Sequence, residues 1–294
     1  MKSRRGLRAA LRRAGVASVA ICALTLVLAP GPAPARAGAS LTPEQLLVMR
    51  QLVSVYENTT TQPRYSYVQD LHDGCGYTAG WVGFCTEAGD LLEVVNHYDA
   101  LAANNPLRRY HAELVRLAAG GSARVGGLPG FPAAWRQAAH DGRFISAQNE
   151  VAQQLYLQPA IRLAQRAGLR TPLADAIFFE TAVQHGTGPD PDGLPALIAR
   201  TQRLAGGRPG ADLTEARWLT IFNHVRLADL LHPHNRARMA DWPESAGRAR
   251  SDQRLVAGGY FDLAGRIPVH VFGGSFTLGR ASSTTRVVRR GSAS

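Results

Sequence analysis

Two carboxylates, Glu57 and Asp73, are the residues of this sequence best placed to do chemistry together. Glu57 ends a predicted helix, and Asp73 opens the glycine-rich stretch DGCG sixteen positions later. On one continuous helix their backbones would lie about 24 Å apart, but the segment 59–63 ends in proline and lets the chain reverse. Two carboxyl groups about 6.5 to 9.5 Å apart can hydrolyse a glycosidic bond with inversion. Both residues are also ordinary features of a helix end and a turn, so spacing alone leaves that interpretation open.

Helical periodicity and end signals predict the elements that would hold these carboxylates. Thr42, Pro43 and Gln45 form a helix start with a capping box, and apolar residues at helical spacing continue to Glu57. The ranges 65–71 and 76–84 are rich in aromatic and β-branched residues and flank Asp-Gly, which predicts an antiparallel hairpin. Helical patterns follow at 91–101, 144–157, 159–167, 173–185, 194–204 and 213–231, with loops at 119–132, 187–193 and 232–246. The predicted fold class is α+β, mainly helical, with one small β element near the N-terminus.

The N-terminal segment is typical of an export signal. A basic head is followed by an uncharged, mostly apolar run at 14–29 that is too short for a comfortable membrane span. Small residues predict that the signal, residues 1–37, is cleaved after Ala37 or Ala39, and the string SRRGL leaves a twin-arginine route open. We therefore expect a secreted, extracellular protein with no membrane contact in its mature form. It would have one large domain at 40–279 and a basic Ser/Thr/Arg-rich tail at 280–294, which we expect to be disordered.

The net charge and the cysteines indicate which partners and which covalent links to expect. The formal net charge of +11 falls to +4 without residues 1–37, and residues 38–279 are formally neutral. The basic pI therefore gives no indication of a nucleic-acid partner, which would need a basic face within the folded part. Only Cys75 and Cys85 follow the signal. Outside the cytosol a disulfide between them is the favoured interpretation, and two buried thiols are the alternative.

The sequence around the two carboxylates resembles that of a known family. The strings ENTT, DGCGYTAG, GFC and GDLLEVV are similar to the N-terminal signature of the family 46 chitosanases, which cut β-1,4 glucosamine polymers. The resemblance implies a lysozyme-like fold with two lobes around a cleft, the catalytic domain spanning 40–279, and an inverting endo-acting mechanism. It implies that Glu57 is the general acid, that Asp73 is the general base and that Thr78 holds the attacking water.

The resemblance also implies supporting roles. Tyr67 and Asp90 match residues that contact the sugar, and three residues match an ion network behind the acid: Glu180, Arg226 and Arg254. The sequence departs from the family at two positions. Glu180 stands where that network usually has an aspartate, and Cys75 stands where many members have an arginine.

Several alternatives stay open at this point. Asp90 could instead cap the helix 91–101, and the whole protein could be a lysozyme-like hydrolase of peptidoglycan or acetylated chitin, or a polysaccharide-binding protein without turnover. GPDPDG at 188–193 lacks the downstream ligands of a calcium loop, and His232-Pro233-His234 lacks a carboxylate at a catalytic spacing. Neither segment indicates a metal site, so we expect no metal or other cofactor. From the family resemblance we expect a monomer that acts on chitosan.

Overall fold

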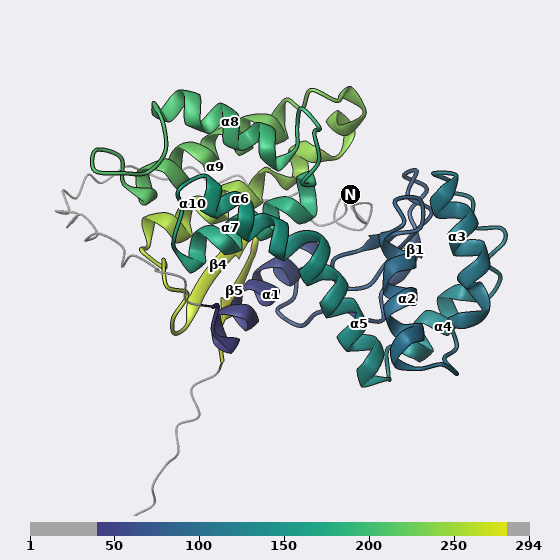
Figure 1. The fold of residues 1–294 in the computed structure, drawn as a ribbon. Helices are drawn as coiled ribbons and strands as arrows, with labels where there is room; N and C mark the ends of the chain where they lie inside the picture. The colour runs from purple at the N-terminus through teal and green to yellow at the C-terminus, as the bar shows by residue number, and fades with distance from the viewer. Residues whose placement is uncertain (1–39, 281–294) are drawn as a thin grey trace, which may run out of the picture.

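The computed structural model describes residues 40–280, and its elements form two lobes (Figure 1). The predicted signal at 1–37 and the tail beyond Arg280 lie outside the described residues. Within residues 40–280, no helix is both long and apolar enough to span a bilayer. The mainly helical α+β architecture predicted from the sequence is confirmed.

Helix α1 (Pro43–Asn58) begins and ends as its sequence predicts. The Thr42 side chain accepts a hydrogen bond from Gln45 N, and the Gln45 side chain accepts one from Thr42 N, which completes the capping box. Thr59 ends the helix in the left-handed conformation and donates its N–H to Val55 O. Glu57 therefore lies in the last turn, at the point where the chain leaves the larger lobe.

The smaller lobe contains the predicted hairpin, which a third strand extends. Strands β1 (Val68–Asp70), β2 (Tyr77–Ala79) and β3 (Phe84–Cys85) form one antiparallel sheet in that order. Helices α2 (Asp90–Leu101), α3 (His111–Ala119) and α4 (Phe131–Ala138) cover it, together with the short 3-10 helix η1 (Arg108–Tyr110). An aromatic cluster fills this lobe, formed by Tyr77, Tyr110, Phe131, Trp135 and Phe144. The sequence patterns did not predict helices α3 and α4.

A long helical rod joins the two lobes. It consists of α5 (Gly142–Ala152), the π-helical segment η2 (Gln153–Leu157) and α6 (Gln158–Arg166), which follow one another without a break. Helix α5 packs against α2 in the smaller lobe, and α6 packs against α7 in the larger one (Figure 1). The rod thereby fixes one lobe against the other.

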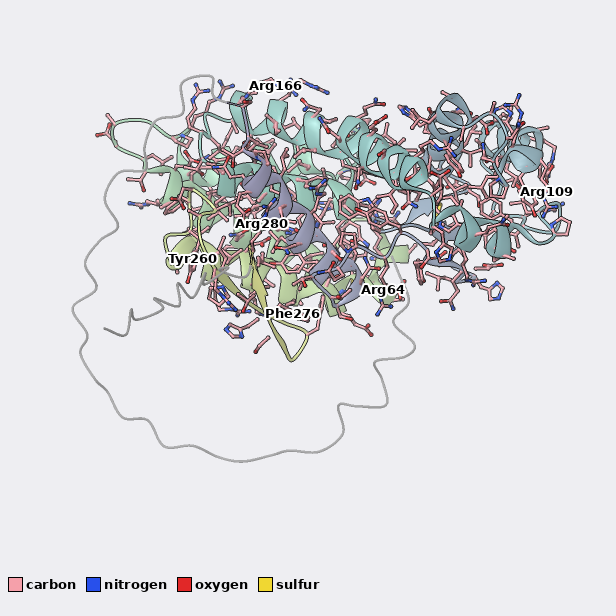
Figure 2. The ribbon with its side chains drawn as sticks, turned by 90° about the horizontal axis from the view of Figure 1, so that it is seen from below. Arg64, Arg109, Arg166, Tyr260, Phe276 and Arg280 are labelled. Atoms are coloured by element: carbon pink, nitrogen blue, oxygen red, sulfur yellow. A yellow bond between two sulfur atoms is a disulfide. The ribbon has the colours of Figure 1, made fainter. Side chains whose placement is uncertain are left out.

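The larger lobe is built around α7 (Pro172–His185), which is buried along most of its length. Around it lie α1, α6, α8 (Leu194–Ala205), α9 (Glu215–Leu231), the 3-10 helices η3 (Arg236–Ala240) and η4 (Trp242–Ser245), and α10 (Ala246–Ala257). A second antiparallel hairpin, β4 (Ile267–Val271) and β5 (Gly274–Leu278), packs against α1 and α10. Gly279 N donates to Gln51 Oε1 of α1, and Arg280 lies beside that helix (Figure 2). The prediction of a single β element near the N-terminus was therefore wrong.

Candidate active site

Glu57 is a buried acid held by one arginine. Its side chain is only 4% exposed, and Arg248 Nη1 of α10 donates to its Oε1 over 2.8 Å. Helix α1 ends one residue later, and from there the chain passes from the larger lobe to the strands of the smaller one (Figure 1).

A buried chain of alternating charges continues behind Glu57. Arg248 Nη1 also donates to Glu180 Oε1 over 3.3 Å, and Arg226 Nη2 donates to the same oxygen over 2.8 Å. Arg226 Nη1 bonds to Asp252 Oδ2 over 2.9 Å. The hydroxyl of Tyr56 donates to Asp252 Oδ1 over 2.7 Å, which closes the chain one residue before Glu57. The structure thus brings Glu180 and Arg226 together behind the acid, as the sequence analysis expected.

Neighbouring carboxylates keep Arg248 charged despite its burial. Burial alone would lower the pKa of Arg248, but the Glu57 and Glu180 carboxylates outweigh it and raise that pKa. Burial and then the charge of Glu180 raise the pKa of Asp252. Burial, followed by the charges of Asp252 and Glu180, raises the pKa of Tyr56 well above its usual range, so Tyr56 remains a donor.

Arg254 is a correction to the predicted network. Its side chain is exposed, and its Nη2 bonds to the backbone oxygen of His270 in β4. Arg248 takes the expected place, six residues earlier on the same helix. Six residues turn an α-helix by about 240° beyond a full turn, so the two arginines point to different sides of α10.

Asp73 lies in the loop between β1 and β2, with its geometry fixed by its neighbours. Its Oδ1 accepts a hydrogen bond from Cys75 N over 3.1 Å. The structure joins Cys75 to Cys85 of β3 by a disulfide, as expected. Gly76 is held at φ +73°, and a Cβ there would lie 2.2 Å from Thr86 Oγ1. Only glycine fits this close approach, and together with the disulfide it ties the loop that carries Asp73 to the sheet.

Thr78 lies in the middle of β2 and is 1% exposed. Its hydroxyl has no hydrogen-bond partner among the described residues. A buried hydroxyl without a partner is costly, and a water molecule is the smallest group that would satisfy it.

Asp90 is the first residue of α2, but it does not cap that helix. The cap position is Gly89, in the left-handed conformation, and it makes no side-chain capping bond. Asp90 Oδ1 instead accepts from Cys85 N, and Oδ2 accepts from the hydroxyl of Tyr156 over 2.6 Å. The capping alternative is therefore wrong, and Asp90 is oriented by contacts to β3 and η2.

Tyr156 is a site residue that the sequence analysis missed. It lies in the π-helical segment η2, a kind of insertion that is frequent at functional sites. Burial, then the charges of Asp90 and Glu57, raise its pKa well above the usual range, so both carboxylates are its electrostatic neighbours. Nothing in the local sequence pattern distinguishes a π-turn from an α-helix, and so no signal was available.

Tyr67, the other predicted sugar contact, lies just before β1. Its backbone oxygen accepts from Gly80 N over 2.8 Å, and its hydroxyl lies 3.4 Å from Gln69 Oε1. The residue is half-buried.

A second charged cluster lies in the larger lobe, where the sequence analysis discounted a metal loop. The ligand atoms of Asp192, Asp229 and His234 all lie within 4.8 Å of one another. Arg238 pairs with Asp192, and Arg200 pairs with Asp229. Because an arginine pairs with each of the two carboxylates, we interpret the cluster as a set of ion pairs that holds the loop before α8 in place.

Comparison with known proteins adds family membership to this geometry. A family model, glycosyl hydrolase family 46, matches residues 51–267. The chain is 42% identical over 233 residues to a chitosanase of Bacillus subtilis (strain 168), covering 79% of this chain and 83% of that one. It is 35% identical over 227 residues to a chitosanase of a Streptomyces species, covering 76% and 77%.

Solved structures agree. A mutant chitosanase from Bacillus subtilis, crystallised with six glucosamine units, aligns with a TM-score of 0.76 at 41% identity, covering 81% of this chain and 100% of that one. A family 46 chitosanase from Gynuella sunshinyii, crystallised with chitotetraose, aligns with a TM-score of 0.77 at 37% identity, covering 82% and 100%. The fold and the site therefore define a glycoside hydrolase with a lysozyme-like fold. The chain belongs to glycosyl hydrolase family 46.

Proposed function

We propose that this protein is a secreted, monomeric endo-chitosanase that hydrolyses β-1,4 bonds between glucosamine units with inversion. The observation that carries the proposal is the Glu57 carboxylate, buried and held by Arg248 at the position to which the family resemblance assigns the general acid. The similarity to chitosanases, including structures solved with glucosamine units or chitotetraose, supports the substrate class.

In this mechanism the chain supplies an acid, a base and a place for water. Glu57 protonates the leaving glycosidic oxygen, and the Arg248 guanidinium beside it stabilises the anion that remains afterwards. Asp73 removes a proton from the attacking water, and Cys75 N–H fixes the orientation of its carboxylate. The unpartnered hydroxyl of Thr78 holds that water. Single displacement at the anomeric carbon then gives the α-product from a β-linked substrate.

Acidic residues near the site suit a cationic polymer. Asp70 lies on β1, Glu87 lies in the turn between β3 and α2, and Glu93 lies in the first turn of α2, as does Asp90. Glucosamine units carry ammonium groups in mildly acidic conditions, and a formally neutral domain attracts them through a local acidic field. Asp90, oriented by Tyr156, is placed to receive one ammonium group.

Hydrolysis of chitosan by the wild type, the Glu57→Gln variant and the Asp73→Asn variant tests this function. Release of reducing ends by the wild type is expected, with kcat falling about 10²- to 10⁴-fold or more in each variant. Glu44→Gln, at the opposite end of α1, serves as the matched control and should keep full activity. NMR during early hydrolysis should show the α-anomer. Full turnover in both active-site variants, or β-product, would contradict the proposal.

A further inference from the structure

One buried histidine lies between the chain of charges behind Glu57 and the second charged cluster. His185 is the last residue of α7 and is 4% exposed. Its Nε2 accepts a hydrogen bond from Arg226 Nε over 3.3 Å. Its Nδ1 lies 2.8 Å from the backbone oxygen of Asp192. The Trp242 ring packs edge-on against the imidazole, with centroids 4.6 Å apart.

These two contacts select one form of the imidazole. A backbone carbonyl can only accept, so Nδ1 carries the proton and Nε2 keeps its lone pair. Burial, then the charge of Arg226, lower the pKa of His185 well below its ordinary value, so the ring is neutral at mildly acidic pH. The charged groups that face it come from several elements: Arg226 and Asp229 on α9, Arg248 on α10, Arg238 on η3, and Asp192 in the loop before α8.

Arg226 depends on this lone pair for one of its donors. Its Nη1 bonds to Asp252, and its Nη2 bonds to Glu180 and to Gln184 Oε1. Among the described residues, Nε donates to His185 alone. Because the guanidinium is planar, an acceptor at Nε sets the plane in which the other nitrogens point.

We infer that His185 is a positioning residue for the general acid. By accepting the Nε–H of Arg226, it fixes the guanidinium that orients Glu180, and Glu180 in turn orients Arg248 against Glu57. The inference rests on the proposed role of Glu57 and extends the machinery to a residue that touches neither the substrate nor the acid.

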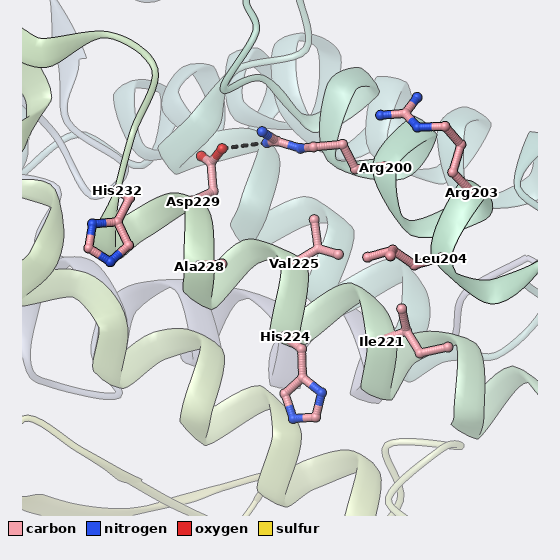
Figure 3. Close-up of a pocket in the computed structure, with 9 residues that line it drawn as sticks. All are labelled: Arg200, Arg203, Leu204, Ile221, His224, Val225, Ala228, Asp229 and His232. Carbon is pink, nitrogen blue, oxygen red and sulfur yellow. Dashed lines mark hydrogen bonds and ion pairs between the residues drawn. The ribbon is translucent and has the colours of Figure 1, made fainter.

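The second cluster holds the other side of the imidazole. The Asp192 side chain is fully buried and accepts from the backbone N–H of His234 and of Asn235 and from Arg238. Burial would raise the pKa of Asp192, but these donors outweigh it and lower the pKa to about 2. Toward the surface, Arg200 pairs with Asp229 beside the pocket between α8 and α9 (Figure 3). The carbonyl that selects the tautomer is therefore held in place in mildly acidic solution.

Two side chains that each replace one nitrogen of the imidazole test the inference. Glutamine places its terminal oxygen near the Nε2 position and can accept from Arg226; asparagine places its amide near Nδ1 and cannot reach Arg226. With a soluble glucosamine hexamer, His185→Asn should lower kcat about 10-fold while KM stays within about 2-fold. The alkaline limb of the pH profile of kcat for this variant should move to higher pH. A loosened Arg226 leaves the negative charge of Glu180 less compensated beside Glu57, which favours the protonated form of Glu57. His185→Gln should restore both readouts. Thr201→Val, a buried change on α8 that touches neither network, is the control.

The outcomes separate the two proposals. Suppose that Glu57→Gln loses hydrolysis while His185→Asn keeps the wild-type kcat and pH profile. This result would overturn the positioning role and leave the proposed function intact. Absence of hydrolysis by the wild type would overturn both. Nitrogen NMR of the wild type gives an answer independent of variant folding: the His185 ring should be neutral with Nε2 unprotonated at pH 5.5. A protonated Nε2 would overturn the inference, because it could not accept from Arg226.

Discussion

Removal of Arg248 should strongly destabilise the protein. Arg248→Met keeps most of the buried volume and deletes the charge shared by Glu57 and Glu180 at 2.8 Å and 3.3 Å. Each unit-charge pair at this range is worth about 4 kcal/mol at an effective dielectric constant of 20. The gross loss of about 8 kcal/mol is offset by several kcal/mol for the guanidinium that no longer needs desolvation. We therefore expect the free energy of unfolding to fall by about 3 to 5 kcal/mol at pH 7.

Urea and thermal unfolding across pH measure this loss. The expected decrease corresponds to a Tm about 6 to 20 °C lower for a domain of this size. The deficit should shrink as the pH falls toward 4, because protonation of Glu57 removes the buried negative charge that the variant leaves without its arginine, whereas Glu180 keeps its contact to Arg226. Arg254→Met, on the exposed side of the same helix, should change the free energy of unfolding by less than about 0.5 kcal/mol.

A loss below about 1 kcal/mol at pH 7 would contradict the reasoning, since breaking a buried ion pair costs about 3 kcal/mol or more. A deficit of the same size at pH 4 and pH 7 would also contradict it, because the loss would then come from packing and not from charge.

Three further predictions concern other parts of the structure. Reduction of the Cys75–Cys85 disulfide, which spans a sequence separation of 10, should lower the free energy of unfolding by about 3 kcal/mol, as urea unfolding with and without dithiothreitol would show. Thr78→Val should lower kcat about 10-fold without lowering Tm, because the lost hydroxyl has no partner in the described protein; a lower Tm with full kcat would contradict its water-holding role. Burial raises the pKa of Asp229 to about 6 despite Arg200, so the folded state binds the proton more tightly. The stability of the wild type relative to Asp229→Asn should thus decline as the pH rises from about 4 to above 6, and a constant difference in Tm would contradict this.

Local signals predicted the elements that carry the chemistry. The capping box at Thr42 and Gln45 and the poor helical sequence after Asn58 set both ends of α1. The hairpin β4–β5 was missed although alternating residues and two glycines mark it, because Pro268 and the short flanking segments weaken the strand pattern. Helices α3 and α4 are short, and much of their stability comes from packing in the aromatic cluster of the smaller lobe, which no local pattern reports.

The sequence could name candidate residues within one local stretch, but it could not predict contacts made between distant segments of the fold. Glu57, Asp73 and Thr78 follow from a resemblance that covers one compact stretch. Arg248 and Arg254 lie on one helix, and choosing between them requires knowing which face of α10 meets α1. Tyr156 reaches Asp90 from 66 residues away through a π-helical turn, a geometry that tertiary packing decides.

The charges in the closed chain of residues behind Glu57 do not balance when every group is ionised. Its three carboxylates, Glu57, Glu180 and Asp252, face two guanidiniums, those of Arg226 and Arg248. Fully ionised, the set carries one surplus negative charge, and it becomes neutral when it takes up one proton. If Glu57 is the general acid, as we propose, this set is electrically balanced only when it holds one proton, which is the state in which the enzyme can cleave the next bond.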